Sequence, residues 1–260
     1  PHLFEMAPEI FAGRALAVRV DPGGGLGHHE KVVTAGAHAK FGHPAAEVSE
    51  VVAGARALGS RITGLHSHVG SGILDPGSWG RTLDGLLTLR EELPDLQWID
   101  VGGGLGVVER PGQVALDLAR VEEGLAALRY GLDGIELRME PGRYLVSDAG
   151  VLVTPVTQVR SKGDVKFVGV ATGMNSLLRP ALYGAWHGIS NLSRLDEPAA
   201  GYWHVVGPIC ETGDVLGRDR MLPETRPGDV LLIDNAGAYG RVMSSSYNMR
   251  DPAEEVCLPG

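Results

Sequence analysis

The sequence lacks long apolar runs, contains little cysteine and carries no excess of positive charge, and each of these absences excludes a class of protein. No stretch of roughly 18 apolar residues occurs, so we expect no membrane span. A formal net charge of −9 argues against a nucleic-acid-binding surface. Two cysteines, Cys210 and Cys257, do not make a disulfide scaffold and are typical of a reducing cytosol. We therefore expect a cytoplasmic protein.

Glycine, in contrast, is abundant, with 38 residues in 260. The glycines lie in clusters, which predicts loops with unusual backbone angles or a close approach of the backbone to another group. Between the clusters, strand patterns alternate with helix patterns. Strands are predicted at 14–21, 61–69, 96–104 and 134–143, and helices at 44–59, 79–93 and 113–130. This alternation predicts a parallel sheet, either in a (β/α)₈ barrel or in a doubly wound fold.

From about residue 144 the pattern changes to short apolar runs separated by turn signals, namely LVTPVTQVRS, KFVGVAT, YWHVVGP and DVLLIDNAG. Such runs predict an antiparallel β domain. We therefore expect two domains, residues 1–143 and 144–260. A complete barrel takes about 250 residues, so the first domain is either a small open sheet or a barrel whose first half lies outside this sequence.

Two predicted strand ends carry groups that suit an anionic ligand. Glycines 102–104 would let backbone N–H groups approach an anion, and Arg143 offers a forked donor. Three glycines by themselves most often form a tight turn, but two adjacent loops of this kind make a stronger case. A phosphate would repel Glu140, which fits better against a cation or N–H of the same ligand. A pyridinium ring with a phosphate arm has both features.

His66 and His68 are two residues apart on a predicted strand, so we expect them to share one face. A metal pair is one interpretation, but no third ligand follows at a telling spacing, and we assign no metal. Two alternatives stay open. One is a buried, hydrogen-bonded histidine, and the other is an imidazole stacked on a flat ring, with Ser71 reaching the phosphate of that ligand.

Three further stretches contain reactive or charged side chains in unusual contexts. Most lone cysteines are small buried hydrophobes, but Cys210, followed by Glu-Thr-Gly-Asp, is a plausible proton donor. Apolar neighbours flank Arg179, which suggests a pocket, and arginine favours a carboxylate partner there. Tyr239 lies among small residues and is either structural or aimed at a ligand.

Together these stretches resemble the diaminopimelate decarboxylase family, in the alanine-racemase-like class (fold type III) of pyridoxal-phosphate enzymes. The resemblance runs over nearly the whole chain and rests on the combination of HSHVGSG, DVGGGLG, EPGRYLV, RPALYGAWH, ICETGD and GAYGRVMSSSYN. It implies an α/β fold, the C-terminal half of a (β/α)₈ barrel that binds the cofactor, followed by an antiparallel β domain. It also implies a homodimer whose active sites are shared between the subunits.

The resemblance further implies pyridoxal 5'-phosphate as the cofactor, decarboxylation of meso-2,6-diaminopimelate to L-lysine and CO₂ as the reaction, and a role for each matching residue. His68 would stack on the cofactor ring and Glu140 would pair with the pyridine nitrogen. Cys210, reaching across from the second subunit, would protonate the carbon that loses CO₂. The residues implied around the phosphate are Ser71, Gly103, Gly104, Gly142, Arg143 and Tyr239. The residues implied to contact the substrate are Arg143, Arg179, Tyr183, Glu211 and Tyr239.

Two features depart from the family's pattern. The family has a lysine that binds the cofactor covalently, in an early YAxKAN-like motif, and none of the four lysines here lies in such a motif. Lys31 and Lys40 are instead expected to be surface lysines. The sequence also stops soon after GAYG and begins without an initiator methionine or the apolar run of a signal peptide. We expect the C-terminal part of a longer polypeptide, and a fusion to an aspartokinase, known in this family, is compatible with that.

Two alternative functions stay open at this point. One is decarboxylation of another basic amino acid, such as ornithine or arginine, or of carboxynorspermidine. Arg179 beside PALYGAWH favours a substrate with a distal carboxylate over these. The other is a non-catalytic relative that binds a partner subunit, which the presence of Cys210, Glu140 and Arg143 disfavours.

Overall fold

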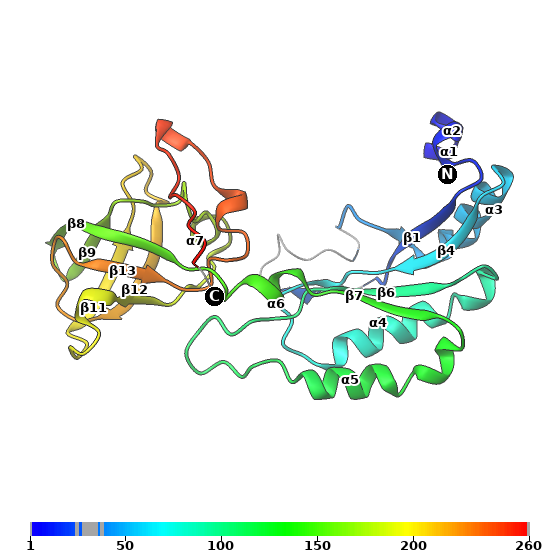
Figure 1. The fold of residues 1–260 in the computed structure, drawn as a ribbon, viewed down its shortest axis with the longest axis horizontal. Coiled ribbons are helices and arrows are strands. Elements are labelled where there is room, and N and C mark those ends of the chain that lie inside the picture. Colours follow the sequence, from blue (N-terminus) through cyan, green and yellow to red (C-terminus); the bar gives the residue numbers. More distant parts are fainter. Residues whose placement is uncertain (1, 24–25, 28–35, 37–38, 259–260) are drawn as a thin grey trace. The chain divides into compact units, whose positions relative to one another are not determined.

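The computed structural model describes residues 2–23, 26–27, 36 and 39–258, and Figure 1 shows its fold. The chain divides into two compact units, each with its own hydrophobic core. Unit 1 comprises Pro1–Val107 and Val114–Tyr144, and unit 2 comprises Val108–Gln113 and Leu145–Gly260. Within the described residues, no helix is both long enough and apolar enough to cross a membrane. Lys31 lies outside the described residues, whereas Lys40 is exposed, as expected.

Unit 1 is built on a five-stranded sheet in which all neighbouring strands run parallel. The strand order is β3-β1-β4-β6-β7. The strands span Ala15–Asp21 (β1), His43–Pro44 (β3), Arg61–His66 (β4), Trp98–Gly103 (β6) and Glu136–Glu140 (β7). The central strands β4 and β6 are almost entirely buried, as expected for parallel strands that are covered on both faces. A further short pair joins β2 (Leu26–Gly27) to β5 (Gly70–Ser71).

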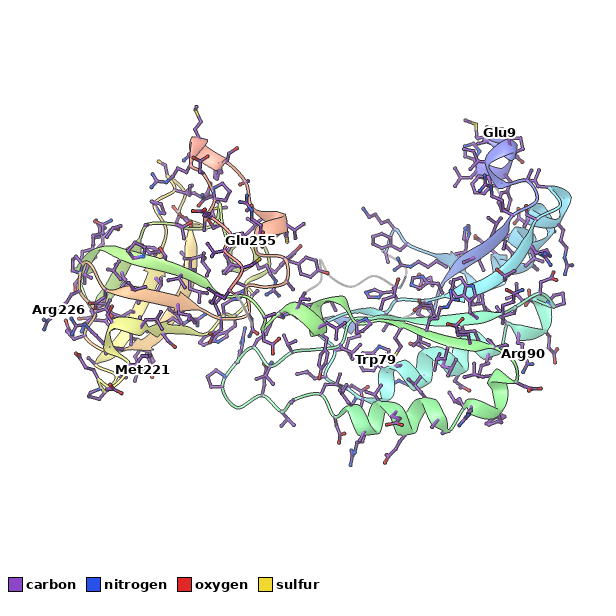
Figure 2. The ribbon with its side chains drawn as sticks, viewed as in Figure 1. Glu9, Trp79, Arg90, Met221, Arg226 and Glu255 are labelled. Carbon is purple, nitrogen blue, oxygen red and sulfur yellow. The ribbon has the colours of Figure 1, made fainter. Side chains whose placement is uncertain are left out.

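Unit 1 also contains helices, of which α3 and α4 pack directly on this sheet and α4 reaches the predicted site. They span His2–Met6 (α1), Pro8–Phe11 (α2), Val48–Ala57 (α3), Gly77–Leu87 (α4), Leu118–Ala126 (α5) and Gly142–Val146 (α6). In α4, Trp79, Leu83 and Leu86 recur at helical spacing and are buried. The Trp79 side chain (Figure 2) donates from Nε1 to the Gly103 carbonyl oxygen at 2.9 Å, so α4 holds the end of β6.

Two predicted elements of unit 1 are shorter than the sequence pattern suggests. The helix predicted at 113–130 begins only at Leu118, because Asp117 caps it by accepting from the Arg120 N–H at 3.2 Å. The strand predicted at 61–69 ends at His66. The expectation that His66 and His68 share one face of a strand is therefore wrong, since His68 lies in the loop that follows and accepts a hydrogen bond from Gly103.

Unit 2 is built on a six-stranded sheet with the order β10-β13-β8-β9-β11-β12. The strands span Leu152–Lys162 (β8), Val165–Val170 (β9), Ile189–Asn191 (β10), Gly201–Val206 (β11), Val215–Leu222 (β12) and Val230–Ile233 (β13). The two ends of this order, β10 and β12, also approach each other, so the sheet is nearly closed. Its core contains Trp203, Leu231 and Ile233.

The β sheet predicted to follow the parallel sheet is confirmed, with one difference in strand direction. Four neighbouring pairs are antiparallel, whereas β9 and β11 run parallel. Parallel neighbours need a long crossover connection, and here it contains helix α7 (Arg179–Tyr183) and strand β10. The crossover therefore carries RPALYGAWH, one of the motifs on which the resemblance rests.

Candidate active site

Three strand ends of unit 1 bring together side chains that are far apart in the sequence. Because β4, β6 and β7 are parallel, their carboxyl ends lie along one edge of the sheet. His66 is in register with Asp100, and Gly103 is in register with Glu140. Carboxyl ends of strands are where barrel enzymes place their active sites. Of the predicted cofactor residues of unit 1, Gly103 and Glu140 are the last residues of β6 and β7, and Ser71 lies in the short β5. His68 and Gly104 lie in the loops at this edge, and Gly142 and Arg143 begin α6.

The carboxylate of Glu140 accepts a hydrogen bond that the sequence did not reveal. The donor is His66, whose Nε2 lies 3.0 Å from Glu140 Oε2. The Glu140 side chain is 55% exposed, so the carboxylate also remains open to a ligand. Asp100 lies nearby and accepts from the Gly102 N–H at 2.8 Å. His66 and Asp100 precede Glu140 by many residues, and no local pattern links the three.

These three side chains also form a group that could hold a metal ion. One potential ligand atom from each of His66, Asp100 and Glu140 lies within 4.8 Å of the others. The sequence led us to assign no metal, because it offered only the two histidines of HSH. Exposed carboxylates commonly lie close together without a metal. The resemblance also assigns Glu140 to the pyridine nitrogen of the cofactor. The geometry nevertheless shows that His66 is hydrogen-bonded to the Glu140 carboxylate.

His68 is held as a neutral imidazole. Its Nδ1 accepts from the Gly103 N–H at 3.0 Å, which places the ring proton on Nε2. Burial lowers the pKa of His68, and the positive charge of Arg19 lowers it further, against the smaller opposing effect of Glu140. At neutral pH the ring is therefore uncharged. A flat, uncharged and partly buried ring in a fixed orientation suits stacking on an aromatic ligand.

The glycines of this edge are required by close contacts between the loops. A Cβ at Gly103 would lie 1.9 Å from the Glu140 carbonyl oxygen, and one at Gly104 would lie 2.1 Å from the Gly70 carbonyl oxygen. Around a Cβ at Gly142, in contrast, nothing lies within 4 Å among the described residues, so this backbone faces open space. Arg143, the next residue, is buried at the start of α6. A glycine loop, an arginine, a carboxylate and a neutral imidazole together fit a pyridinium ring with a phosphate arm.

Unit 2 contains the second group of predicted residues, and Arg179 is its most deeply buried member. Arg179 opens α7 and is 2% exposed. Its Nη2 lies 3.2 Å from Glu109 Oε1, and its Nη1 lies 3.0 Å from His187 Nε2. His187 Nδ1 donates to the Asp234 carbonyl oxygen at 2.7 Å, so Nε2 is the acceptor for Arg179. The predicted pocket arginine is thus already paired. Tyr183 ends the same helix, one turn away.

The loop that carries Cys210 and Glu211 is held in shape by Asp214. The Asp214 side chain is buried and accepts from the Met174 N–H at 2.6 Å and from the Ile209 N–H at 2.8 Å. Cys210 and Glu211 themselves are exposed. Glu211 Oε2 accepts from the Tyr247 hydroxyl at 3.1 Å, and this hydrogen bond raises the pKa of Tyr247. The loop held by Asp214 thus exposes the Cys210 thiol and the Glu211 carboxylate.

Tyr239 has a backbone conformation that is uncommon for a residue with a side chain. Its φ is +61°, and its side chain is about half exposed. Positive φ in a non-glycine residue stores strain that recurs at functional sites. Gly237, two residues before Tyr239, is needed for packing, because a Cβ there would lie 2.0 Å from the Val146 carbonyl oxygen. Within unit 2 the turn therefore displays the phenol on a constrained backbone. Cys257 is exposed near the end of the described residues.

Known proteins resemble the chain over almost all of its length. Residues 2–147 match the family described as pyridoxal-dependent decarboxylase, pyridoxal binding domain, and residues 79–237 match its C-terminal sheet domain. The chain is 42% identical to a diaminopimelate decarboxylase of Methanothermobacter thermautotrophicus, over 98% of this chain and 61% of that protein. The chain is 34% identical to the diaminopimelate decarboxylase of Escherichia coli, over 98% of this chain and 64% of that protein.

Solved structures of pyridoxal-phosphate decarboxylases are also similar to the chain. The diaminopimelate decarboxylase of Helicobacter pylori in complex with L-lysine superposes with a TM-score of 0.84 at 31% identity, over 95% of this chain and 62% of that one. A lysine decarboxylase in complex with PLP and cadaverine superposes with a TM-score of 0.80 at 25% identity, over 97% of this chain and 63% of that chain. This likeness confirms the predicted fold. The chain spans about three fifths of the length of these relatives.

Proposed function

The chain belongs to the family of pyridoxal-dependent decarboxylases, and from this premise we propose that the polypeptide carrying it decarboxylates meso-2,6-diaminopimelate to L-lysine. The observation that carries the proposal is the edge of the unit 1 sheet, where Glu140, His68 and the glycine loop meet at the ends of three parallel strands. The substrate follows from the identity of 42% to a diaminopimelate decarboxylase.

In this proposal residues 1–143 hold the cofactor, pyridoxal 5'-phosphate. When bound, the cofactor draws electrons away from the substrate carbon that loses CO₂. Glu140, oriented by His66, keeps a proton on the pyridine nitrogen, and His68 stacks on the ring. The phosphate is assigned to Ser71, Gly103, Gly104, Gly142, Arg143 and Tyr239. Gly142 faces open space, so a phosphate can approach its backbone closely.

Residues 144–260 supply the proton donor and, together with Arg143, the substrate contacts. When the bond to CO₂ breaks, its electron pair stays on the substrate carbon, which then takes a proton from the Cys210 thiol. Water returns a proton to the thiolate. The exposure of Cys210 on its rigid loop supports this role. The substrate contacts are assigned to Arg143, Arg179, Tyr183, Glu211 and Tyr239. The proposal includes a cytoplasmic homodimer in which Cys210 acts in the site of the other subunit.

One observation favours a second candidate, decarboxylation of a basic amino acid without a distal carboxylate. Arg179, the residue assigned to that carboxylate, is already paired with Glu109. A lysine decarboxylase is also among the proteins of similar structure. The two candidates differ in whether the substrate carries a second carboxylate, as meso-diaminopimelate does, or lacks one, as L-lysine, L-ornithine and L-arginine do.

The test is an assay of the polypeptide that carries this chain, supplied with pyridoxal phosphate and offered one amino acid at a time. We expect CO₂ and L-lysine in equal amounts from meso-diaminopimelate, and no cadaverine from L-lysine. L-ornithine and L-arginine serve as further comparison substrates. Preferential release of CO₂ from any of these three basic amino acids would contradict the proposed substrate.

A further inference from the structure

Tyr247 is a residue of unit 2 to which the proposed function gives no role, yet its hydroxyl group contacts a residue that has one. Tyr247 Oη donates to Glu211 Oε2 at 3.1 Å, although the two residues lie 36 positions apart. Glu211 is assigned to the substrate and directly follows Cys210, the proposed proton donor. The hydrogen bond to Glu211 and, to a smaller extent, the charge of Cys210 raise the pKa of Tyr247, so the tyrosine lies near the thiol as well. Tyr247 is therefore placed to orient the acid of this loop.

The turn that carries Tyr247 is anchored at both of its ends to one buried residue, Asn175, which is 2% exposed. The carbonyl oxygen of Asn175 accepts from the Ser245 N–H at 2.9 Å. Its side-chain amide donates to the carbonyl oxygens of Arg250 and Asp251 at 3.4 and 3.1 Å. Asn175 thus fixes the backbone on both sides of Tyr247.

The same segment also holds the loop that carries Glu211. Met174, the neighbour of Asn175, donates its backbone N–H to Asp214 Oδ1 at 2.6 Å. Residues 174–175 therefore bind the base of the loop and the base of the turn. The hydrogen bond between Tyr247 and Glu211 joins the two segments a second time, at the exposed side chains that they carry.

The backbone of this turn is held in a conformation that is uncommon for residues with side chains. Asn248 and Met249, which follow Tyr247, have φ angles of +55° and +57°. Asparagine tolerates this left-handed region, whereas methionine adopts it at a cost. The Met249 side chain is 96% exposed, so its own packing does not offset that cost. Strain of this kind recurs at functional sites, and here it accompanies the turn that directs Tyr247 toward Glu211.

We infer that Tyr247 is a positioning residue, whose hydroxyl group holds the Glu211 carboxylate in the direction that contact with the substrate requires. This inference rests on the proposed function, which assigns Glu211 to the substrate. In the free protein Tyr247 is 42% exposed and water competes for the hydrogen bond, so the bond contributes little to stability. A substrate that covers Glu211 displaces this water, and a hydrogen bond to a charge is stronger where water is excluded. The effect of Tyr247 should therefore appear in catalysis rather than in folding.

The first test is a double-mutant cycle on kcat/KM for meso-diaminopimelate, in the polypeptide that carries this chain, supplied with pyridoxal phosphate. We expect Tyr247→Phe to lower kcat/KM by about tenfold, as for a lost hydrogen bond to a charged group, mainly through a higher KM. In the Glu211→Ala background, which has no carboxylate to orient, the same substitution should have no effect. The matched control is Tyr202→Phe, which removes a hydroxyl from another exposed tyrosine of unit 2 and should leave kcat/KM unchanged.

The second test follows the ultraviolet absorbance of tyrosinate as the pH is raised, and it needs no activity. It uses the pH range over which circular dichroism shows folded protein. The tyrosine that is lost in Tyr247→Phe should ionise above the ordinary pKa of 10.0, because the hydrogen bond to Glu211 raises its pKa. In the Glu211→Ala background the same tyrosine should ionise at a lower pH than in the parent.

The outcomes separate the inference from the proposed function. A parent that releases no CO₂ from diaminopimelate would defeat the proposed function, while the absorbance titration would still show whether Tyr247 contacts Glu211. In an active parent, equal losses of kcat/KM from Tyr247→Phe in both backgrounds would show that the hydroxyl does not act through Glu211 and would overturn the inference. A marked fall in the urea unfolding midpoint of Tyr247→Phe would overturn it as well, because the hydroxyl would then support the fold.

Discussion

At the residue scale, the role proposed for Glu140 can be tested directly. His66 donates to its carboxylate at 3.0 Å, and the carboxylate is otherwise open to a ligand. In Glu140→Gln the amide cannot hold a proton on the pyridine nitrogen, whereas the phosphate contacts stay in place. We expect kcat to fall far more than the affinity for the cofactor. The measurements are steady-state kinetics and a spectroscopic titration with pyridoxal phosphate, and a parental rate in this variant would disprove the role of Glu140.

His68 should make the stability of unit 1 depend on pH. Burial, the largest cause, lowers its pKa below the ordinary value of 6.5. The unfolded chain therefore binds more protons than the folded one as pH falls through 6.5, and stability should decrease over that interval. Above pH 6.5, His68 is neutral in both the folded and the unfolded chain, and its contribution to stability no longer changes with pH. In His68→Gln, which keeps an acceptor for the Gly103 N–H, this part of the pH dependence should disappear.

Urea unfolding of parent and variant at pH 8 and pH 5.5 checks the effect of His68. The parent should lose more stability between the two pH values than the variant loses. Equal losses would mean that His68 is protonated as easily in the folded protein as in the unfolded one. The neutral ring proposed for cofactor stacking would then lack support.

At the scale of elements, the contact between the ends of β6 and β7 should be intolerant of a single methyl group. A Cβ at Gly103 would meet the Glu140 carbonyl oxygen at 1.9 Å, so the two strands would have to separate. Overpacking of this kind costs about 1–3 kcal/mol. Gly103→Ala should thus lower the unfolding midpoint and weaken cofactor binding, because the same strands carry the cofactor residues.

Gly85 provides the matched control for Gly103. It lies within α4, it is exposed, and nothing lies within 4 Å of an added Cβ among the described residues. Alanine is favoured over glycine in a helix by about 0.5–1 kcal/mol. Gly85→Ala should therefore raise the unfolding midpoint slightly and leave cofactor binding unchanged. A Gly103→Ala variant as stable as Gly85→Ala would show that the strand ends can separate freely.

The sequence predicted those elements in which one periodicity extends over the whole segment. Strands β1, β4, β6 and β7 of unit 1 were predicted because their runs are largely apolar and end in glycine or charged residues, whereas the two-residue strands β2, β3 and β5 were not predicted. Strand β12 was not predicted, because Gly217, Arg218, Asp219 and Arg220 interrupt its apolar pattern. Arg220 is nevertheless buried, with its guanidinium carbon 3.1 Å from the centre of the Trp186 ring. A buried arginine that packs on an indole cannot be distinguished from a surface arginine by local sequence.

The candidate site was predictable wherever a motif carried it, and it was not where two distant side chains meet. Glu140, Arg143 and Cys210 stand in recognisable stretches, although their roles remain proposals. The pairs His66–Glu140 and Glu109–Arg179 join residues 74 and 70 positions apart. Such pairs arise from strand register and from the path of a loop. No window of sequence contains both partners, so only the fold reveals them.

The proposed shared site makes a prediction at the scale of the whole molecule. Cys210 and Glu140 belong to different units, and in the proposed homodimer each site combines Glu140 of one subunit with Cys210 of the other. A dimer of Cys210→Ala with Glu140→Gln subunits then has one site with both defects and one site with neither. Random mixing of equal amounts should recover about a quarter of the parental activity, because about half of the dimers are mixed. Each variant is assayed separately as the control. Freely exchanging subunits that recover no activity would show that Cys210 acts within its own chain.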